Sequence, residues 1–106
     1  MPTLKENPNL RDFQNYVKDL EKERGFQKED VSKKCLLLGE EVGELYKAIR
    51  KKDSILRIDR NSKFGSVDEE LADIIIGICT IANRFDIDLE QAFREKEEIN
   101  KKRIWE

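Results

Sequence analysis

Two pairs of carboxylates stand three residues apart within otherwise apolar stretches of the sequence. The first pair is Glu41 and Glu44, and the second is Glu70 and Asp73. In a helix, residues three apart leave the same side, so each pair would present its two carboxylates together. Burying several negative charges side by side is costly unless a cation compensates them. The spacing therefore predicts a site for a divalent cation.

The available ligand types narrow the choice of metal. The chain contains no His and only two Cys, Cys35 and Cys79. This excludes the common zinc sites, Ser-His-Asp and Cys-His catalysis, and the Glu-x-x-His pairs of ferritin-like di-iron bundles. Carboxylate oxygens select Mg²⁺, with Mn²⁺ as a substitute, and a Mg²⁺ ion held by a few carboxylates typically takes phosphate oxygens as its remaining ligands. We therefore expect a phosphate-containing substrate.

Hydrophobic periodicity predicts four helices that would position these acids in an all-α, four-helix bundle-like fold. Gly25 ends the first helix, Ser66 and Glu69 form a capping box on the third, and Asp88 caps the fourth. The isoleucine-rich run of residues 74–81 resembles a buried strand. The length of the whole segment 66–85 and its acidic start favour a helix. The predicted helices are residues 9–24, 28–52, 66–85 and 88–103.

The second predicted helix places its acids differently around its circumference. Glu41 falls between two neighbouring apolar arcs, and Glu44 lies at their outer edge. Glu40 falls on the face of ordinary solvated charges. We therefore expect Glu41 and Glu44 to belong to the site, and Glu40 to be a surface residue first and a helper second.

The third predicted helix is apolar over most of its circumference. Its acids share one narrow polar stripe, which faces either solvent or an internal polar site and consists of Glu70, Asp73, Gly77, Thr80 and Arg84. A chain of 106 residues cannot cover so apolar a helix by itself. We therefore expect a homo-oligomer, either a homodimer or a homotetramer.

Composition sets further bounds on the protein. A length of 106 residues suits one domain, and a net charge of −2 does not suit a general binder of nucleic acid backbones. We expect no signal peptide and no membrane span. The two Cys are interpreted as buried free thiols in a reducing, cytoplasmic compartment. Residues 53–66 are predicted as a loop, either a solvated linker or a basic flap over an anionic ligand, with five bases in or beside it: Lys51, Lys52, Arg57, Arg60 and Lys63.

In this order, the motifs resemble those of the MazG-like all-α nucleoside triphosphate pyrophosphohydrolases. Residues 34–49 (KCLLLGEEVGELYKAI) resemble the first family motif and residues 67–76 (VDEELADIII) the second. The family pattern is Glu-x-x-Glu, a variable spacer and Glu-x-x-Asp, and here 25 residues separate Glu44 from Glu70. Lys96, Asn100 and Arg103 resemble the basic and amide cluster near the family's C-terminus. The resemblance spans about residues 10–105 and implies a single MazG-like domain, 1–106.

The resemblance also implies an activity. It is the Mg²⁺-dependent hydrolysis of (deoxy)nucleoside triphosphates to the monophosphate and pyrophosphate, as in cleaning of the nucleotide pool. Glu41 would activate the attacking water, with Glu40 as an assistant. The implied phosphate-binding residues are Lys96, Asn100 and Arg103, and the implied metal ligands are Glu41, Glu44, Glu70 and Asp73. The family is usually oligomeric, with sites near subunit contacts.

Three alternatives remain open from the sequence. A related pyrophosphohydrolase would act on phosphoribosyl-ATP with the same bundle and acids. A non-enzymatic helical interaction module would use the acids only in salt bridges, and a divalent-cation sensor would keep the metal without hydrolysis. The preferred base is not readable, because the aromatic residues serve equally as packing and as stacking surfaces; they include Phe13, Tyr16, Phe26 and Trp105.

Overall fold

The computed structural model describes residues 1–26, 28–53 and 65–105. These residues form four α-helices and no strand. The all-α prediction is confirmed, and the isoleucine-rich run is helical. Most of the predicted basic loop lies outside the described residues, including Arg57, Arg60 and Lys63, whereas Lys51 and Lys52 belong to the last turn of a helix. The helices are α1 (Leu10–Arg24), α2 (Val31–Asp53), α3 (Val67–Arg84) and α4 (Leu89–Lys101).

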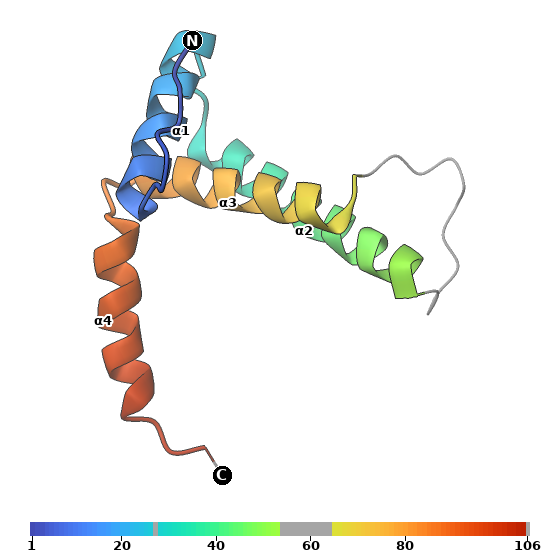
Figure 1. Ribbon diagram of the computed structural model, residues 1–106, viewed down its shortest axis with the longest axis vertical. Coiled ribbons are helices and arrows are strands. Elements are labelled where there is room, and N and C mark those ends of the chain that lie inside the picture. Colours follow the sequence, from blue (N-terminus) through green and yellow to red (C-terminus); the bar gives the residue numbers. More distant parts are fainter. Residues whose placement is uncertain (27, 54–64, 106) are drawn as a thin grey trace.

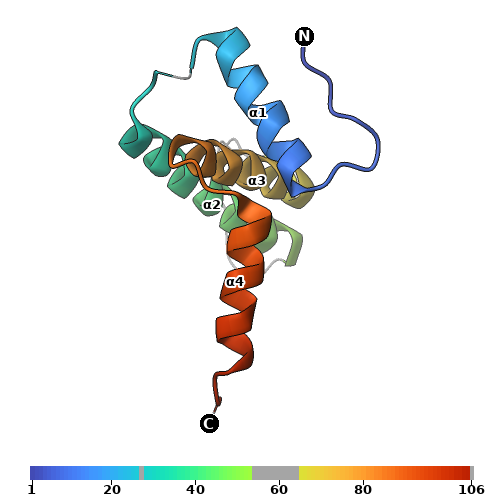
Figure 2. The same cartoon turned by 90° about the vertical axis from the view of Figure 1, so that its left-hand side faces the viewer.

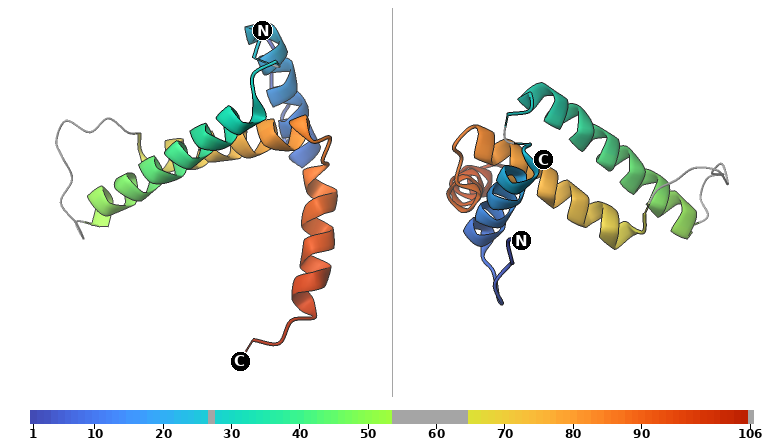
Figure 3. Two further views of the ribbon diagram at one scale, coloured as in Figure 1. Left: turned by 180° about the vertical axis from the view of Figure 1, so that it is seen from behind. Right: turned by 90° about the horizontal axis from the view of Figure 1, so that it is seen from above.

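The helix pair α2 and α3 is the centre of the molecule. The two helices run antiparallel and side by side, as Figure 1 and Figure 3 show. Helix α1 packs across α3 near the C-terminal end of that helix (Figure 2). Helix α4 begins beside the start of α1 and then runs away from the α2–α3 pair (Figure 1). The α2–α3 pair therefore carries the predicted acids, while α4 stands apart from it.

Three helix ends follow the sequence signals. Asn9 and Asp12 form a capping box on α1, in which each side chain accepts a hydrogen bond at 2.9 Å from the backbone N–H of the other residue. Gly25 ends α1 with φ 73°, a left-handed conformation that glycine adopts without steric cost. The Asp88 side chain accepts a hydrogen bond at 3.2 Å from the Gln91 N–H and caps α4.

Two predicted helix starts differ from the structure. Helix α2 begins at Val31 and not at residue 28, because the Asp30 side chain accepts a hydrogen bond from the Ser32 N–H at 2.9 Å. The predicted capping box of Ser66 with Glu69 is wrong. The Ser66 hydroxyl donates to the Asp68 carboxylate, so it makes no capping bond to α3. In the first case Asp30 itself accepts the hydrogen bond at the helix start, and in the second Asp68 takes the hydroxyl of the expected cap residue.

Most of the polar stripe of α3 faces the inside of the molecule. Glu70 and Thr80 are buried, and Gly77 packs so closely on Leu38 of α2 that an added Cβ would lie 3.0 Å from the leucine Cδ1. At the end of the stripe, Arg84 forms an ion pair of 2.9 Å with Glu21 of α1. Asp73 on the same stripe is exposed, whereas the other stripe residues face the inside of the molecule.

Much of the apolar surface of α3 faces outward in consequence. Ile75 is 50% exposed and Leu71 is 47% exposed, and Phe93 on α4 is 66% exposed. The buried apolar residues among those described are few and small: Val17, Ala48, Cys79 and Ala82. One chain therefore leaves large apolar side chains without cover.

The two cysteines differ in their surroundings. Cys79 on α3 is 1% exposed, which agrees with the prediction of a buried free thiol. Cys35 is also a free thiol, but its predicted burial is wrong, because Cys35 is exposed on α2 in the single chain. Within the described residues, no helix combines the length and apolarity that crossing a bilayer requires.

Candidate metal centre

Three of the four predicted metal ligands meet between α2 and α3. One carboxylate oxygen from each of Glu41, Glu44 and Glu70 lies within 4.8 Å of the other two. Glu70 is 3% exposed, and the two α2 acids are half-buried. The three-residue step on α2 presents Glu41 and Glu44 on one side, and the antiparallel α3 brings Glu70 against them. The cluster thus joins two helices that are separated by the 54–64 segment in sequence.

The backbone preceding α3 holds the carboxylate of Glu70. The Gly65 N–H donates a hydrogen bond of 2.6 Å to Glu70 Oε1. Glu70 also lies in the first turn of α3, where the helix dipole favours a negative charge. These two interactions fix one oxygen of the carboxylate and leave the second available to the cluster.

Two buried oxygens of the cluster find no hydrogen-bond donor among the described residues. They are Glu41 Oε2 and Glu70 Oε2. A buried polar atom without a partner is costly, and a buried carboxylate oxygen without a partner is more so. A cation placed between the three side chains would compensate both oxygens. The residues present therefore fit a divalent cation with oxygen ligands.

The pKa of Glu41 is raised from 4.5 to about 7. Burial is the largest cause, followed by the hydrogen bond that a protonated Glu41 shares with Glu70 and by the negative charge of Glu44. The charge of Asp73 adds to the effect. Without a cation, Glu41 therefore holds its proton up to about pH 7.

The two other predicted site acids stand outside the cluster. Asp73 lies on α3, one turn after Glu70; it is exposed, and its oxygens are not among those that meet. It still faces the cluster closely enough to raise the pKa of Glu41. Glu40 is exposed on α2 and is not part of the cluster.

The three predicted phosphate-binding residues are not near these acids within one chain. Lys96 is exposed on α4, Asn100 donates a hydrogen bond of 3.2 Å to Glu97, and the Arg103 guanidinium lies 5.8 Å from the centre of the Trp105 ring. They lie on or just beyond α4, which leads away from the α2–α3 pair (Figure 3). A single chain therefore does not bring them to the metal centre.

A cavity of about 340 Å³ lies between α1, the turn after it and the side of α3. Its walls include Phe26, Lys34 and Thr80. The Lys34 ammonium lies 5.0 Å from the centre of the Phe26 ring and 3.3 Å from a carboxylate oxygen of Glu29. Sequence reasoning missed Lys34, although its place seven residues before Glu41 puts both on one face of α2.

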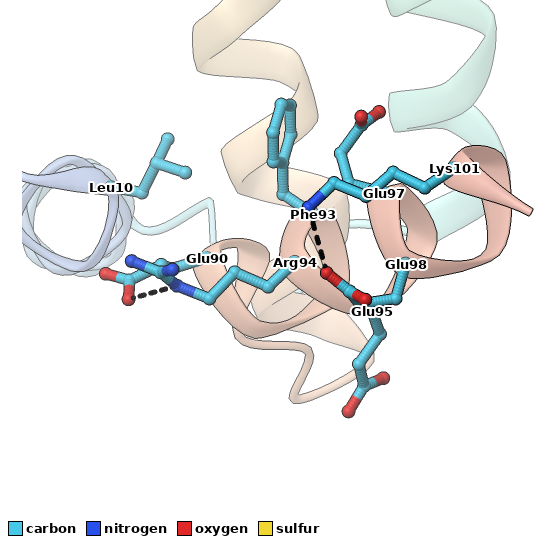
Figure 4. A pocket seen from close by; sticks show the side chains of 8 residues that line it. All are labelled: Leu10, Glu90, Phe93, Arg94, Glu95, Glu97, Glu98 and Lys101. Carbon is cyan, nitrogen blue, oxygen red and sulfur yellow. Dashed lines mark hydrogen bonds and ion pairs between the residues drawn. The ribbon is translucent and has the colours of Figure 1, made fainter.

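A second hollow, of about 650 Å³, lies between the start of α1 and α4 (Figure 4). Phe93 and four glutamates line it, together with Arg94 and Lys101. Both bases are already paired along α4, with Glu90 and Glu98 respectively, at 3.1 Å each. This surplus of acid makes the hollow unsuitable for a polyphosphate.

The chain was compared with known proteins and protein families. No curated protein matches the chain. The family model for the MazG nucleotide pyrophosphohydrolase domain matches residues 27–104, a stretch that contains α2, α3 and α4 and all three clustered acids. The chain therefore belongs to the family of the MazG nucleotide pyrophosphohydrolase domain.

Proposed function

We propose that this protein is a Mg²⁺-dependent enzyme that hydrolyses (deoxy)nucleoside triphosphates to the monophosphate and pyrophosphate and so cleans the nucleotide pool. The observation that carries the proposal is the meeting of Glu41, Glu44 and Glu70, with two buried oxygens that lack a partner. Membership of a nucleotide pyrophosphohydrolase family supports the reaction class.

The clustered acids would hold Mg²⁺, or Mn²⁺ in its place, and Asp73 would join them from the next turn of α3. When bound, such an ion neutralises charge on the phosphate chain and makes an attacking water more acidic. The exposure of Asp73 leaves it free to turn toward the cluster. The other three acids are held by the packing of α2 on α3.

Glu41 is the proposed proton acceptor for the attacking water. Its Oε2 is buried at the cluster and has no donor among the described residues, so it can accept a proton from a water held there. Without His, a carboxylate must serve in this role. Glu40, our other candidate from the sequence, lies outside the cluster and would assist only from the solvent side.

The nucleoside end of the substrate is proposed to lie in the cavity beside Phe26 and Lys34. Ile76, on its wall, follows Asp73 by three residues on α3, so the cavity continues the line of the metal centre. The Phe26 ring suits stacking of a base. The Lys34 ammonium would bind a phosphate only by exchanging its ion pair with Glu29.

We also propose that the enzyme is a homo-oligomer, a dimer or a tetramer, of single-domain chains spanning residues 1–106. The exposed apolar side chains of α3 and α4 need cover, and a second copy offers matching apolar faces. Such a copy would also supply Lys96, Asn100 and Arg103, which one chain keeps away from its own acids. The free thiols fit a cytoplasmic location.

A panel of ribo- and deoxynucleoside triphosphates with Mg²⁺ or Mn²⁺ tests the proposal, with pyrophosphate and orthophosphate measured separately. We expect pyrophosphate alone, and no product after a chelator is added. Phosphoribosyl-ATP belongs in the panel, because an enzyme specific for it would share the acids. Wild-type protein that binds metal but releases no pyrophosphate from any of these compounds would leave a sensor or an interaction module, and the enzyme proposal would be wrong.

A further inference from the structure

Gly65 stands immediately before α3 and touches the metal centre only through its backbone. Its N–H donates the 2.6 Å hydrogen bond to Glu70 Oε1. The Glu70 side chain is 3% exposed, and its other oxygen has no partner among the described residues. One oxygen is therefore held by the backbone, while the other is buried and left without a partner among the described residues.

The approach of Gly65 to Glu70 depends on the missing side chain. A Cβ added at Gly65 would lie 2.9 Å from Glu70 Oε1 and 2.4 Å from Glu69 Oε2. The exposed Glu69 carboxylate can turn into solvent, but Glu69 Cβ, 3.1 Å from the added atom, can move only with the backbone. Glu70 is enclosed, so its carboxylate must give up its present orientation. Gly65 is not in the left-handed region, so an alanine there brings no backbone strain of its own. The need for glycine at this position comes from the carboxylate and not from the turn.

We propose that Gly65 is a positioning residue of the metal centre, which holds the Glu70 carboxylate so that its free oxygen faces the cation. Groups that orient a metal ligand through its other atom commonly change metal affinity by about 10- to 100-fold. This inference rests on the proposed function only in that the cluster binds a divalent cation; it does not depend on the substrate.

The variant Gly65→Ala tests this role in metal binding without any measurement of turnover. Metal-free protein is titrated with MnCl₂, and free Mn²⁺ is followed by electron paramagnetic resonance. We expect the dissociation constant to rise at least about tenfold, while the melting temperature of the metal-free protein stays within about 3 °C of wild type. An unchanged dissociation constant would overturn the proposal.

Two control variants test whether weaker Mn²⁺ binding in Gly65→Ala comes from Glu70. Gly39→Ala adds a Cβ on α2 where nothing lies within 4 Å, so we expect wild-type Mn²⁺ affinity. Glu69→Ala removes the flexible side chain that the new Cβ would also meet, and we expect it neither to weaken Mn²⁺ binding nor to rescue Gly65→Ala in the double variant. Rescue would show that Gly65 acts through Glu69, and the assignment to Glu70 would be wrong.

A measurement on wild-type protein covers the case in which Gly65→Ala does not fold. Selective ¹⁵N-glycine labelling gives signals from 5 glycines, and the Gly65 amide is expected to shift on addition of Mg²⁺ and in Glu70→Gln. A Gly65 signal that ignores both changes would refute the hydrogen bond as a link to the metal. Pyrophosphate release by wild type is recorded in parallel. Normal release with unchanged Mn²⁺ affinity in Gly65→Ala refutes this inference alone, whereas weakened affinity without release refutes only the proposed enzyme.

Discussion

Gln14 of α1 and Asn83 of α3 bind each other through both their side chains and one backbone carbonyl. The Gln14 side-chain amide donates to Asn83 Oδ1 at 3.1 Å, and the Asn83 amide donates to the Gln14 backbone oxygen at 2.9 Å. Gln14 also donates to the Ile87 carbonyl at 2.8 Å and accepts a hydrogen bond from the Leu89 N–H at 2.9 Å. This one buried side chain therefore joins α1, α3 and the start of α4.

Replacing Gln14 by Ala should lower the free energy of unfolding by about 2 kcal/mol, because the Leu89 N–H, Asn83 Oδ1 and the Ile87 carbonyl lose their hydrogen bonds to the Gln14 side chain. Urea denaturation followed by circular dichroism measures the change. The neighbouring Asn15 is exposed, and Asn15→Ala should change the free energy by less than about 0.5 kcal/mol. Equal effects of the two substitutions would contradict the structural role of Gln14.

Glu70→Gln should lower turnover at least about a hundredfold, since it removes one charge of the metal centre. The metal-free variant should be as stable as wild type or more stable, because repulsion within the cluster falls while Gln can still accept the Gly65 hydrogen bond. Pyrophosphate release and urea denaturation in a chelator test the two parts. The exposed Glu69→Gln serves as the control. If Glu70→Gln lost more than about 1 kcal/mol of stability and kept its activity, the acids would be a structural salt-bridge network instead.

The stability of the metal-free protein should fall with rising pH. The pKa of Glu41 is raised from 4.5 to about 7 in the folded state, so the folded chain binds more protons than the unfolded chain between these values. Over that window the free energy of unfolding should decrease by up to about 3 kcal/mol relative to Glu41→Gln, and then level off. Denaturant titrations in a chelator at several pH values measure it. A pH dependence identical in wild type and Glu41→Gln would argue against the raised pKa.

Addition of Mg²⁺ should raise the melting temperature, and more at pH 7.5 than at pH 5. The ion binds the folded site and must displace the proton from Glu41, which is held more firmly at the lower pH. Differential scanning fluorimetry with and without about 5 mM MgCl₂, enough to occupy a weak site, measures the shift. The shift at pH 7.5 is compared with the shift at pH 5. We expect the shift to disappear in Glu70→Gln. A shift that is equal at both pH values would separate metal binding from the titration of Glu41.

Ile75→Glu should dissociate the proposed oligomer. Ile75 is 50% exposed in one chain, so a charge there costs a monomer little, but it would be buried at an apolar contact with a second copy. Sedimentation velocity at micromolar concentration gives the mass of the particle. Leu4→Glu is the control, because Leu4 is also exposed but precedes α1 and belongs to none of the four helices. A wild-type protein that sediments as a monomer with normal activity would make the oligomer prediction wrong.

The periodicity of the sequence was enough to predict the four helices and the meeting of three acids. Glu41, Glu44 and Glu70 could be placed because their positions on each helix conflict with the surrounding apolar pattern. Glu40 could be placed at the surface from its position on α2, but Asp73, expected among the metal ligands, is exposed and lies outside the cluster. The distance of Asp73 from the cluster depends on how far α3 is rotated against α2. That rotation is set by packing such as Leu38 on Gly77, which no local pattern encodes.

Contacts made by the backbone were harder to predict from the sequence. The role of Gly65 depends on a hydrogen bond to a residue five positions later and on the space that a side chain would fill. A glycine before a helix is common, so its type gave no signal. The exposure of Cys35 could not be predicted either. Its place in the apolar pattern of α2 indicates a buried face, but not whether the same chain or another chain buries it.

The different exposure of the two cysteines gives the chain an internal probe for the opening of its helix core. Cys35 is open to solvent, whereas Cys79 is enclosed and its burial raises the pKa of the thiol. An alkylating reagent should therefore modify Cys35 within its ordinary reaction time and reach Cys79 only when α3 separates from its neighbours. The ratio of singly to doubly labelled protein, read by mass spectrometry, then reports how often the centre of the molecule opens, with no engineered probe.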